Sequence, residues 1–174
     1  MKKLTIQALL DQSWFDIAEL TLLEPKLGSA SASELAYDLE YAIHNLDKQD
    51  EHACSLSLPV QILIKHESSS WFGFLDDIVP SGAARRYWVN FLGLQRLTHA
   101  EQDSILLEKG GIAPVGNLRI KEALPVINPD STLHLRYFSQ SDVADRNVDF
   151  LEYAQQMGAI SGGATGAGGE APKL

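Results

Sequence analysis

Cysteine is nearly absent from this chain of 174 residues, in which Cys54 is the single example. One cysteine cannot form an internal disulfide, which excludes the small secreted scaffolds that depend on such bonds. No apolar run approaches the ~20 residues of a membrane-spanning helix. The first residues also lack the small-residue cleavage site of a secretory signal. The sequence therefore predicts a cytoplasmic protein without a membrane segment.

Positive charge is also scarce. Lys and Arg number 14 against 23 Asp and Glu residues, which gives a net charge of −9 and a pI of about 4.9. Proteins bind nucleic acid largely through cations that neutralise phosphates, so this chain is not expected to bind nucleic acid directly. Hydrophobic residues make up 45% of the chain and charged residues 21%. These fractions are close to globular averages and predict a packed core.

The motifs of familiar catalytic and metal centres are missing as well. The five histidines show no HxxxH spacing and have no second cysteine to join them, so no metal ligand is predicted. No G-x-S-x-G motif marks a serine nucleophile. Cys54 lies in a segment, 53–58, that has the pattern of a strand, and free cysteine is usually buried, which favours a buried structural thiol over a nucleophile. The sequence assigns no catalytic residue.

Hydrophobic periodicity predicts strands first and helices afterwards. Apolar residues alternate over 4–10, 18–22 and 35–41, which is typical of half-buried strands, and a short strand is expected at 55–58. Helical spacing follows over 71–79 and 83–92, where Arg85 and Arg86 would lie on the solvated side. Thr98 and Glu101 form a capping box that opens a helix through 107, closed by Gly110. This order predicts an α+β fold, with a sheet and packed helices over 1–109.

A second unit is expected over 110–174. Residues 115–120 have strand character, and a helix is expected over 141–157. Six glycines fall within 158–169, and the chain then enters strand-like residues that include Lys173. Glycine lets backbone N–H groups approach anionic oxygens, so a glycine-rich loop followed by a lysine suits phosphate binding. Composition alone favours a flexible surface loop.

Four segments carry a family resemblance through their order along the chain. They are SLSLP at 55–59, FLDDIVPS at 74–81 followed by Arg85-Arg86, LLEKGGIAPVGNL at 106–118, and the glycine-rich run from 159 to Lys173. Together they resemble the N-terminal region of HipA-type serine/threonine kinases, the toxins of bacterial toxin–antitoxin pairs. The resemblance spans about residues 14–174. Each motif is weakly specific alone, and the order and spacing carry the resemblance.

The resemblance implies part of an ATP-binding site. The residues that would cover the nucleotide phosphates are Gly116, Asn117, Leu118, Arg119, Ile120 and Lys121, and Lys173 would pair with the α- and β-phosphates. The implied cofactors are ATP and Mg²⁺. The catalytic aspartate and the magnesium ligands would lie beyond Leu174, so the isolated chain is expected to be an inactive start of a kinase N-lobe. Pro114 stands where some family members carry a phosphorylated serine, and proline has no hydroxyl.

The resemblance also implies partners. These are a HipB-like antitoxin and a protein substrate, with an aminoacyl-tRNA synthetase as one candidate, and no membrane is involved. The alternative is a non-catalytic interaction module that binds a kinase core or an antitoxin. The reading frame downstream of Leu174 discriminates between the two, because the kinase interpretation requires a following helical domain with a catalytic aspartate.

Overall fold

A five-stranded antiparallel sheet forms the centre of the computed structural model, which describes residues 1–110, 116–123 and 139–141. The strands are β1 (Lys2–Leu10), β2 (Ser13–Leu22), β3 (Ser33–Tyr37), β4 (Lys65–Ser68) and β5 (Leu118–Ile120). Their order across the sheet is β4-β3-β2-β1-β5, so β4 and β5 are its edges within the part of the chain described. The predicted α+β class is confirmed.

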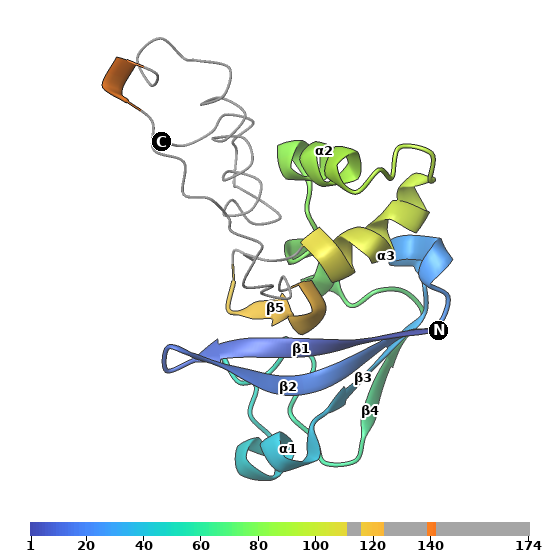
Figure 1. The fold of residues 1–174 in the computed structure, drawn as a ribbon. Helices are drawn as coiled ribbons and strands as arrows, with labels where there is room; N and C mark the ends of the chain where they lie inside the picture. Colours follow the sequence, from blue (N-terminus) through green and yellow to red (C-terminus); the bar gives the residue numbers. More distant parts are fainter. Residues whose placement is uncertain (111–115, 124–138, 142–174) are drawn as a thin grey trace.

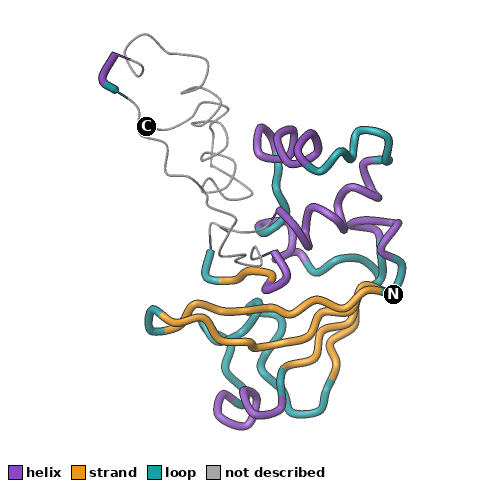
Figure 2. Tube along the Cα trace, in the orientation of Figure 1, coloured by secondary structure: helices purple, strands orange, loops and turns teal. Residues whose placement is uncertain are grey.

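Helices lie at both ends of the sheet (Figures 1 and 2). The α-helices are α1 (Leu39–Asn45), α2 (Gly82–Phe91) and α3 (His99–Gly110), and the 3₁₀ helices are η1 (Pro25–Ala30), η2 (Gly73–Asp77) and η3 (Lys121–Ala123). Helices α2 and α3 lie together at one end of the molecule, and α1 lies at the opposite end (Figure 1). Among the described residues, none of the helices has the length and apolar character needed to cross a membrane.

The β1–β2 hairpin sets the register of the sheet. Its two-residue turn places Asp11 and Gln12 at φ 46° and 64°, the positive values that suit a tight hairpin with twisted strands. A bulge between Ile6 and Gln7 leaves both Ile17 and Ala18 of β2 buried. The extra residue therefore shifts the alternation of β2 so that Asp16 pairs with Gln7.

The buried side chains form two clusters of unequal size. The main cluster is formed mostly by side chains on the inner face of the sheet. It includes Leu4, Leu20 and Leu35, which lie opposite one another on three neighbouring strands. The smaller cluster consists of Trp88, Leu94 and Leu106, with partly buried neighbours from α2 and α3. Leu107, the next residue of α3, belongs to the main cluster, so α3 joins the two.

The strand predicted over 35–41 is correct only as far as Tyr37. The alternation of apolar residues continues beyond that point, but Asp38 accepts a hydrogen bond from the Tyr41 backbone N–H at 3.0 Å and caps α1. Aspartate is a preferred N-cap because its carboxylate satisfies an unpaired N–H of the first helical turn. The local cap therefore prevails over the period-two pattern.

Two further predictions were wrong in detail. Residues 55–58 form a tight turn rather than a strand, because the Leu58 N–H donates to the Ser55 carbonyl at 2.9 Å. The predicted helix over 71–79 is the short η2, preceded by Phe72 in an extended conformation. Its apolar residues Leu75 and Ile78 are buried in the main cluster as expected.

The two helices in the second half of residues 1–109 lie close to their predicted positions. The predicted helix over 83–92 corresponds to α2, and the predicted capping box opens α3. Strand β5, which falls in the predicted second unit, is hydrogen-bonded to β1 of the first. The division at residue 109 stays a prediction. The helix expected over 141–157 and the glycine-rich segment with Lys173 lie outside the described residues.

Candidate functional site

Strand β5 contains three of the six residues, 116–121, that were predicted to cover a nucleotide. In antiparallel register, Ile120 faces Ile6, Arg119 faces Gln7 and Leu118 faces Ala8. Because side chains alternate along a strand, Leu118 and Ile120 point toward the core and Arg119 points to the outer face. Ile120 is completely buried, so only its backbone is available to a ligand.

Gly116 and Asn117 form the entry to β5. The Asn117 carbonyl accepts a hydrogen bond from the Leu9 N–H at 2.7 Å, and its side-chain amide donates to the Glu51 carbonyl at 3.0 Å. Gly116 is exposed, and no heavy atom lies within 4 Å of the position a Cβ would take. The packing of the described residues does not require glycine here, which leaves room for a ligand to approach the backbone.

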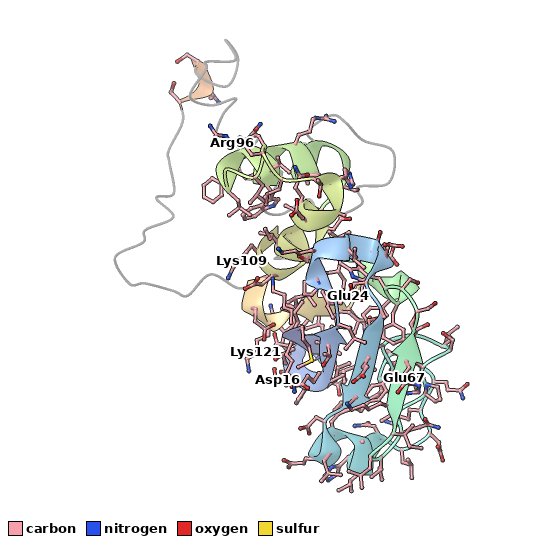
Figure 3. The ribbon with its side chains drawn as sticks, turned by 90° about the vertical axis from the view of Figure 1, so that its right-hand side faces the viewer. Asp16, Glu24, Glu67, Arg96, Lys109 and Lys121 are labelled. Atoms are coloured by element: carbon pink, nitrogen blue, oxygen red, sulfur yellow. The ribbon has the colours of Figure 1, made fainter. Side chains whose placement is uncertain are left out.

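Arg119 and Lys121 belong to a polar group on the outer face of the sheet, which we call the outer-face cluster: Gln7, Trp14, Asp16, Arg119 and Lys121. Arg119 Nε donates to Gln7 Oε1 at 2.8 Å, and Gln7 Nε2 donates to Asp16 Oδ1 at 2.6 Å. Lys121 Nζ donates to Asp16 Oδ2 at 2.6 Å, and the two residues are labelled side by side in Figure 3. Asp16 thus links both cations.

The electrostatics of the cluster favour its charged forms. Burial opposes ionisation of Asp16, but hydrogen bonds from Lys121 and Gln7 outweigh it and hold the pKa of Asp16 below its usual value. The hydrogen bond to Asp16 raises the pKa of Lys121. Partial burial lowers the pKa of Arg119, and the charge of Asp16 opposes that shift. Arginine remains protonated under all ordinary conditions.

Arg119 is the better placed of the two cations for an anionic ligand. Its guanidinium carbon lies 3.7 Å from the centre of the Trp14 ring, a stacking arrangement that fixes its orientation. Within residues 1–110 and 116–123, its two terminal nitrogens make no hydrogen bond. A guanidinium held in this way can donate two parallel hydrogen bonds to a phosphate. Lys121, by contrast, would have to break its hydrogen bond to Asp16 before it could bind an anion.

The sequence did not indicate Gln7, Trp14 or Asp16 as part of this site. Each lies about a hundred residues before β5, and none belongs to a motif. The alternation over 4–10 could have placed Gln7 on the outer face, whereas the outward position of Trp14 and Asp16 follows only from the strand register and the bulge in β2. Lys173, the other predicted phosphate ligand, lies outside the described residues.

Cys54 is a buried structural thiol, as predicted. It is almost fully buried, and burial raises its pKa to about 12 although the Tyr37 hydroxyl opposes the shift. The Tyr37 hydroxyl accepts from the Cys54 N–H at 2.9 Å and donates to the Leu58 carbonyl at 2.6 Å. A thiol that stays protonated at neutral pH is a poor nucleophile. No group of side chains among the described residues has the composition of a metal site.

A cleft of about 380 Å³ lies between η1, η2 and the helices α2 and α3, with Arg85 and Asp103 among its lining residues. The sequence predicted Arg85 on a solvated face, and this was wrong. Its side chain is only 14% exposed, and Nη1 donates to Asp103 Oδ1 at 2.6 Å. Nη2 donates to the His99 carbonyl and to Gln102 Oε1, both at 3.1 Å. The guanidinium is therefore committed to holding α2 against α3.

Comparison with known proteins adds no family to these observations. No protein-family model matches the chain, and a search of curated proteins finds no significant match. The functional assignment consequently depends on the sequence motifs and on the geometry of the outer-face cluster.

Proposed function

We propose that this chain is the N-terminal part of a HipA-like serine/threonine protein kinase and carries part of its ATP-binding site. The observation that supports this most directly is the placement of Arg119. It lies in the segment that resembles the family's nucleotide-covering loop, and its terminal nitrogens are free of hydrogen bonds to described residues. The exposed Gly116 at the entry to the same strand would allow phosphate oxygens to approach the backbone.

Under this proposal the residues of the chain bind and position ATP. Arg119 would donate hydrogen bonds to phosphate oxygens, while Trp14 and Gln7 hold its guanidinium in place. Lys173 would pair with the α- and β-phosphates. ATP with Mg²⁺ would supply the transferable phosphoryl group, and a HipB-like antitoxin and a protein substrate would be the partners. An aminoacyl-tRNA synthetase is one candidate substrate.

Binding of a fluorescent ATP analogue with Mg²⁺ to the 174-residue chain tests the role of Arg119. Losing a charge-assisted hydrogen bond costs ~1.5–3 kcal/mol, so Arg119→Ala should weaken binding by about tenfold or more. Lys3→Ala is the matched control, because Lys3 lies on the outer face of the same sheet and is paired only with Glu19 in the described residues. Equal affinity in wild type and Arg119→Ala would contradict the assignment.

A second test uses the longer protein that this proposal requires. Lys173→Ala should abolish phosphorylation in a radiolabelled ATP assay while the melting temperature stays unchanged. Lys173→Arg should also have low phosphorylation activity, since a planar guanidinium does not replace a compact ammonium group. Normal activity of Lys173→Ala would remove Lys173 from the nucleotide site.

A non-catalytic interaction module is the second candidate. It is favoured by the hydrogen bonds inside the outer-face cluster, where Asp16 and Gln7 already bind Lys121 and Arg119. Such contacts are sufficient to explain both cations as supports of the sheet. An absence of nucleotide binding by the chain, together with a reading frame that stops without a helical catalytic domain, would establish this alternative.

A further inference from the structure

Helix α1 exposes a stripe of large aliphatic side chains at the end of the molecule away from α2 and α3 (Figure 1). The stripe consists of Leu39 and Ile43 of α1 and of Leu46, the residue that caps its C-terminus, and we call it the α1 stripe. These residues are 49%, 58% and 49% exposed, respectively. At 100° per residue, the spacing i, i+4 and i+7 places them within about 60° of one another. Ala42 is fully buried, so the helix is anchored beside the stripe.

The loop that passes the end of α1 also carries exposed apolar side chains. The Asp47 N–H donates to the Val60 carbonyl at 2.9 Å, and the Val60 N–H donates to the Lys48 carbonyl at 3.1 Å. These bonds return the chain to the end of α1, just before Leu63 and Ile64. Leu63 is 86% exposed and has φ 58°, a left-handed conformation that a leucine rarely adopts. The backbone thus presents a large side chain to solvent at a conformational cost.

Acidic residues flank the stripe along the helix: at 100° per residue, Asp38 and Glu40 fall on either side of Leu39, and Asp47 follows Leu46. Residues 38–51 contain five exposed acidic residues and one lysine; the acidic residues are Asp38, Glu40, Asp47, Asp50 and Glu51. Lys48 is half-buried and donates to Asn45 Oδ1 at 3.0 Å. An apolar stripe bordered by negative charge is complementary to a helix that carries apolar residues on one face and lysine or arginine on its flanks.

We propose that the α1 stripe is a docking surface for a basic amphipathic helix of another protein. The span from Leu39 to Leu46 is about 10 Å, which corresponds to two turns of a partner helix. Apolar contact with the stripe would supply the affinity, and the carboxylates would orient the partner and exclude acidic competitors. This inference is independent of nucleotide binding at the outer-face cluster.

Charge disfavours two other occupants. A second copy of the chain would bring two acidic borders together, and like charges across an interface weaken association. The segment 142–157 of the same chain has the pattern expected for a helix, but it carries four acidic residues and one arginine. Neither is complementary to the border of the α1 stripe.

Fluorescence anisotropy with a labelled peptide provides the test. The probe is a helix of about 18 residues with leucines at i, i+3, i+4 and i+7 and lysines elsewhere, and its comparison peptide has glutamates in place of the lysines. The intact chain should bind the lysine peptide and not the glutamate peptide. Binding should weaken as salt rises from about 0.05 to 0.5 M, because screening reduces the charge attraction.

Matched variants separate docking on the stripe from general attraction between opposite charges. Ile43→Lys should weaken binding of the lysine peptide by about tenfold. Leu27→Lys introduces the same charge at a similarly exposed apolar side chain in η1, and should change affinity less than about twofold. Circular dichroism confirms that both variants are folded. Equal losses in the two variants, or equal binding of the two peptides, would overturn the proposal.

The competing occupants have their own readouts. Sedimentation of the wild type as a dimer, with Ile43→Lys as a monomer, would assign the stripe to a second copy instead. Co-sedimentation with phosphatidylcholine vesicles that Ile43→Lys abolishes would assign it to a lipid surface. Either result would overturn the proposal, whereas a monomeric wild type that ignores vesicles and binds the lysine peptide supports it.

Discussion

The inner face of the sheet and the α2–α3 helix pair are held together by different physical means. The inner face of the sheet buries a broad, mainly aliphatic cluster of side chains. These side chains come from β1, β2, β3 and β5, and β4 contributes no buried member to the cluster. Among the described residues, the smaller cluster at the helix pair has Trp88, Leu94 and Leu106 as its buried members, and the ion pair between Arg85 and Asp103 joins the two helices. Apolar burial supplies most of the stability of a large core, whereas removal of one partner of a buried ion pair leaves an uncompensated charge. The two regions should therefore respond differently to the same substitutions.

The largest difference is expected from removing a fully buried leucine in each region. Leu20 and Leu106 both have no exposed surface, so the lost transfer free energy is equal. Leu20 lies between Leu4 and Leu35 in the sheet, where neighbours cannot close the cavity, and Leu20→Ala should cost ~4–5 kcal/mol. Leu106→Ala should cost ~2–3 kcal/mol, because α2 can shift toward the cavity.

Urea unfolding of the two variants measures this difference. The conservative variants Leu20→Ile and Leu106→Ile are the controls, since they keep the side-chain volume. Equal losses of unfolding free energy in the two alanine variants would show that the helix pair is as rigidly packed as the sheet.

The second largest difference between the two regions is expected in how the free energy of unfolding changes at alkaline pH. Folding raises the pKa of Cys54 from 9.0 to about 12, so the folded thiol keeps its proton where the unfolded thiol has lost it. The stability that this group contributes is fully present below pH 9 and is lost progressively as the pH rises toward 12. Between these pH values the free energy of unfolding should fall by up to about 1.4 kcal/mol per pH unit.

Cys54→Ala should flatten the decline of unfolding free energy above pH 9. Tyr87 in the helix pair gives the comparison, because burial also raises its pKa but the residue is only partly buried. Tyr87→Phe should therefore change the alkaline slope less than Cys54→Ala. The same slope in wild type and Cys54→Ala would show that the thiol does not contribute.

The ion pair of the helix region should have an intermediate effect. The side chains of Arg85 and Asp103 are 14% and 12% exposed, so Arg85→Ala leaves a largely buried carboxylate without its cation. A loss of ~2–3 kcal/mol is expected. Lys3→Ala removes an exposed ion pair with Glu19 on the sheet and should change stability by less than ~0.5 kcal/mol.

Amide hydrogen exchange locates the effect of Arg85→Ala. Protection should fall in α2 and in the first turns of α3, while β1, β2 and β3 keep their wild-type protection, because the helix pair can open by itself. A uniform loss across the sheet and the helices would mean that the two regions unfold as one unit.

The same two regions show which features the sequence could predict. Strand β1, the second half of β2 (18–22) and the start of α3 were predicted, because alternation and the Thr98–Glu101 capping box are local patterns; the first half of β2 was missed. The end of β3 was misplaced because alternation alone does not show that Asp38 caps a helix. The role of Arg85 was misjudged for another reason. Its partner Asp103 lies 18 residues away, and only the packing of α2 on α3 reveals it.

The candidate site was predictable to a similar extent. The family resemblance indicated Gly116–Lys121, and of the strand expected over 115–120 residues 118–120 form β5. Gln7, which bonds Arg119, is on β1, where the alternation over 4–10 already points it outward. The outward position of Trp14 and Asp16 on β2 depends instead on the bulge opposite Ile6 and Gln7. A bulge of one residue reverses the faces of a strand, and no period-two pattern read from the sequence includes it.

The smallest effect is expected at the N-terminus of α3, where a local cap supports the helix that joins the two clusters. Thr98 Oγ1 accepts from the Glu101 N–H at 3.3 Å, and Glu101 Oε2 accepts from the Thr98 N–H at 3.0 Å. Thr98→Ala removes one partner of this box and should cost ~1 kcal/mol. Thr98→Ser keeps the hydroxyl, so its free energy of unfolding should be close to that of the wild type.

Urea unfolding measures the free energy of unfolding of both variants, and amide exchange shows which part of α3 each substitution affects. Because Leu107 still anchors α3 in the main cluster, exchange should quicken at residues 99–102 and stay slow near Leu107. Faster exchange along the whole of α3 in Thr98→Ala would show that the cap, and not the sheet core, holds the helix in place.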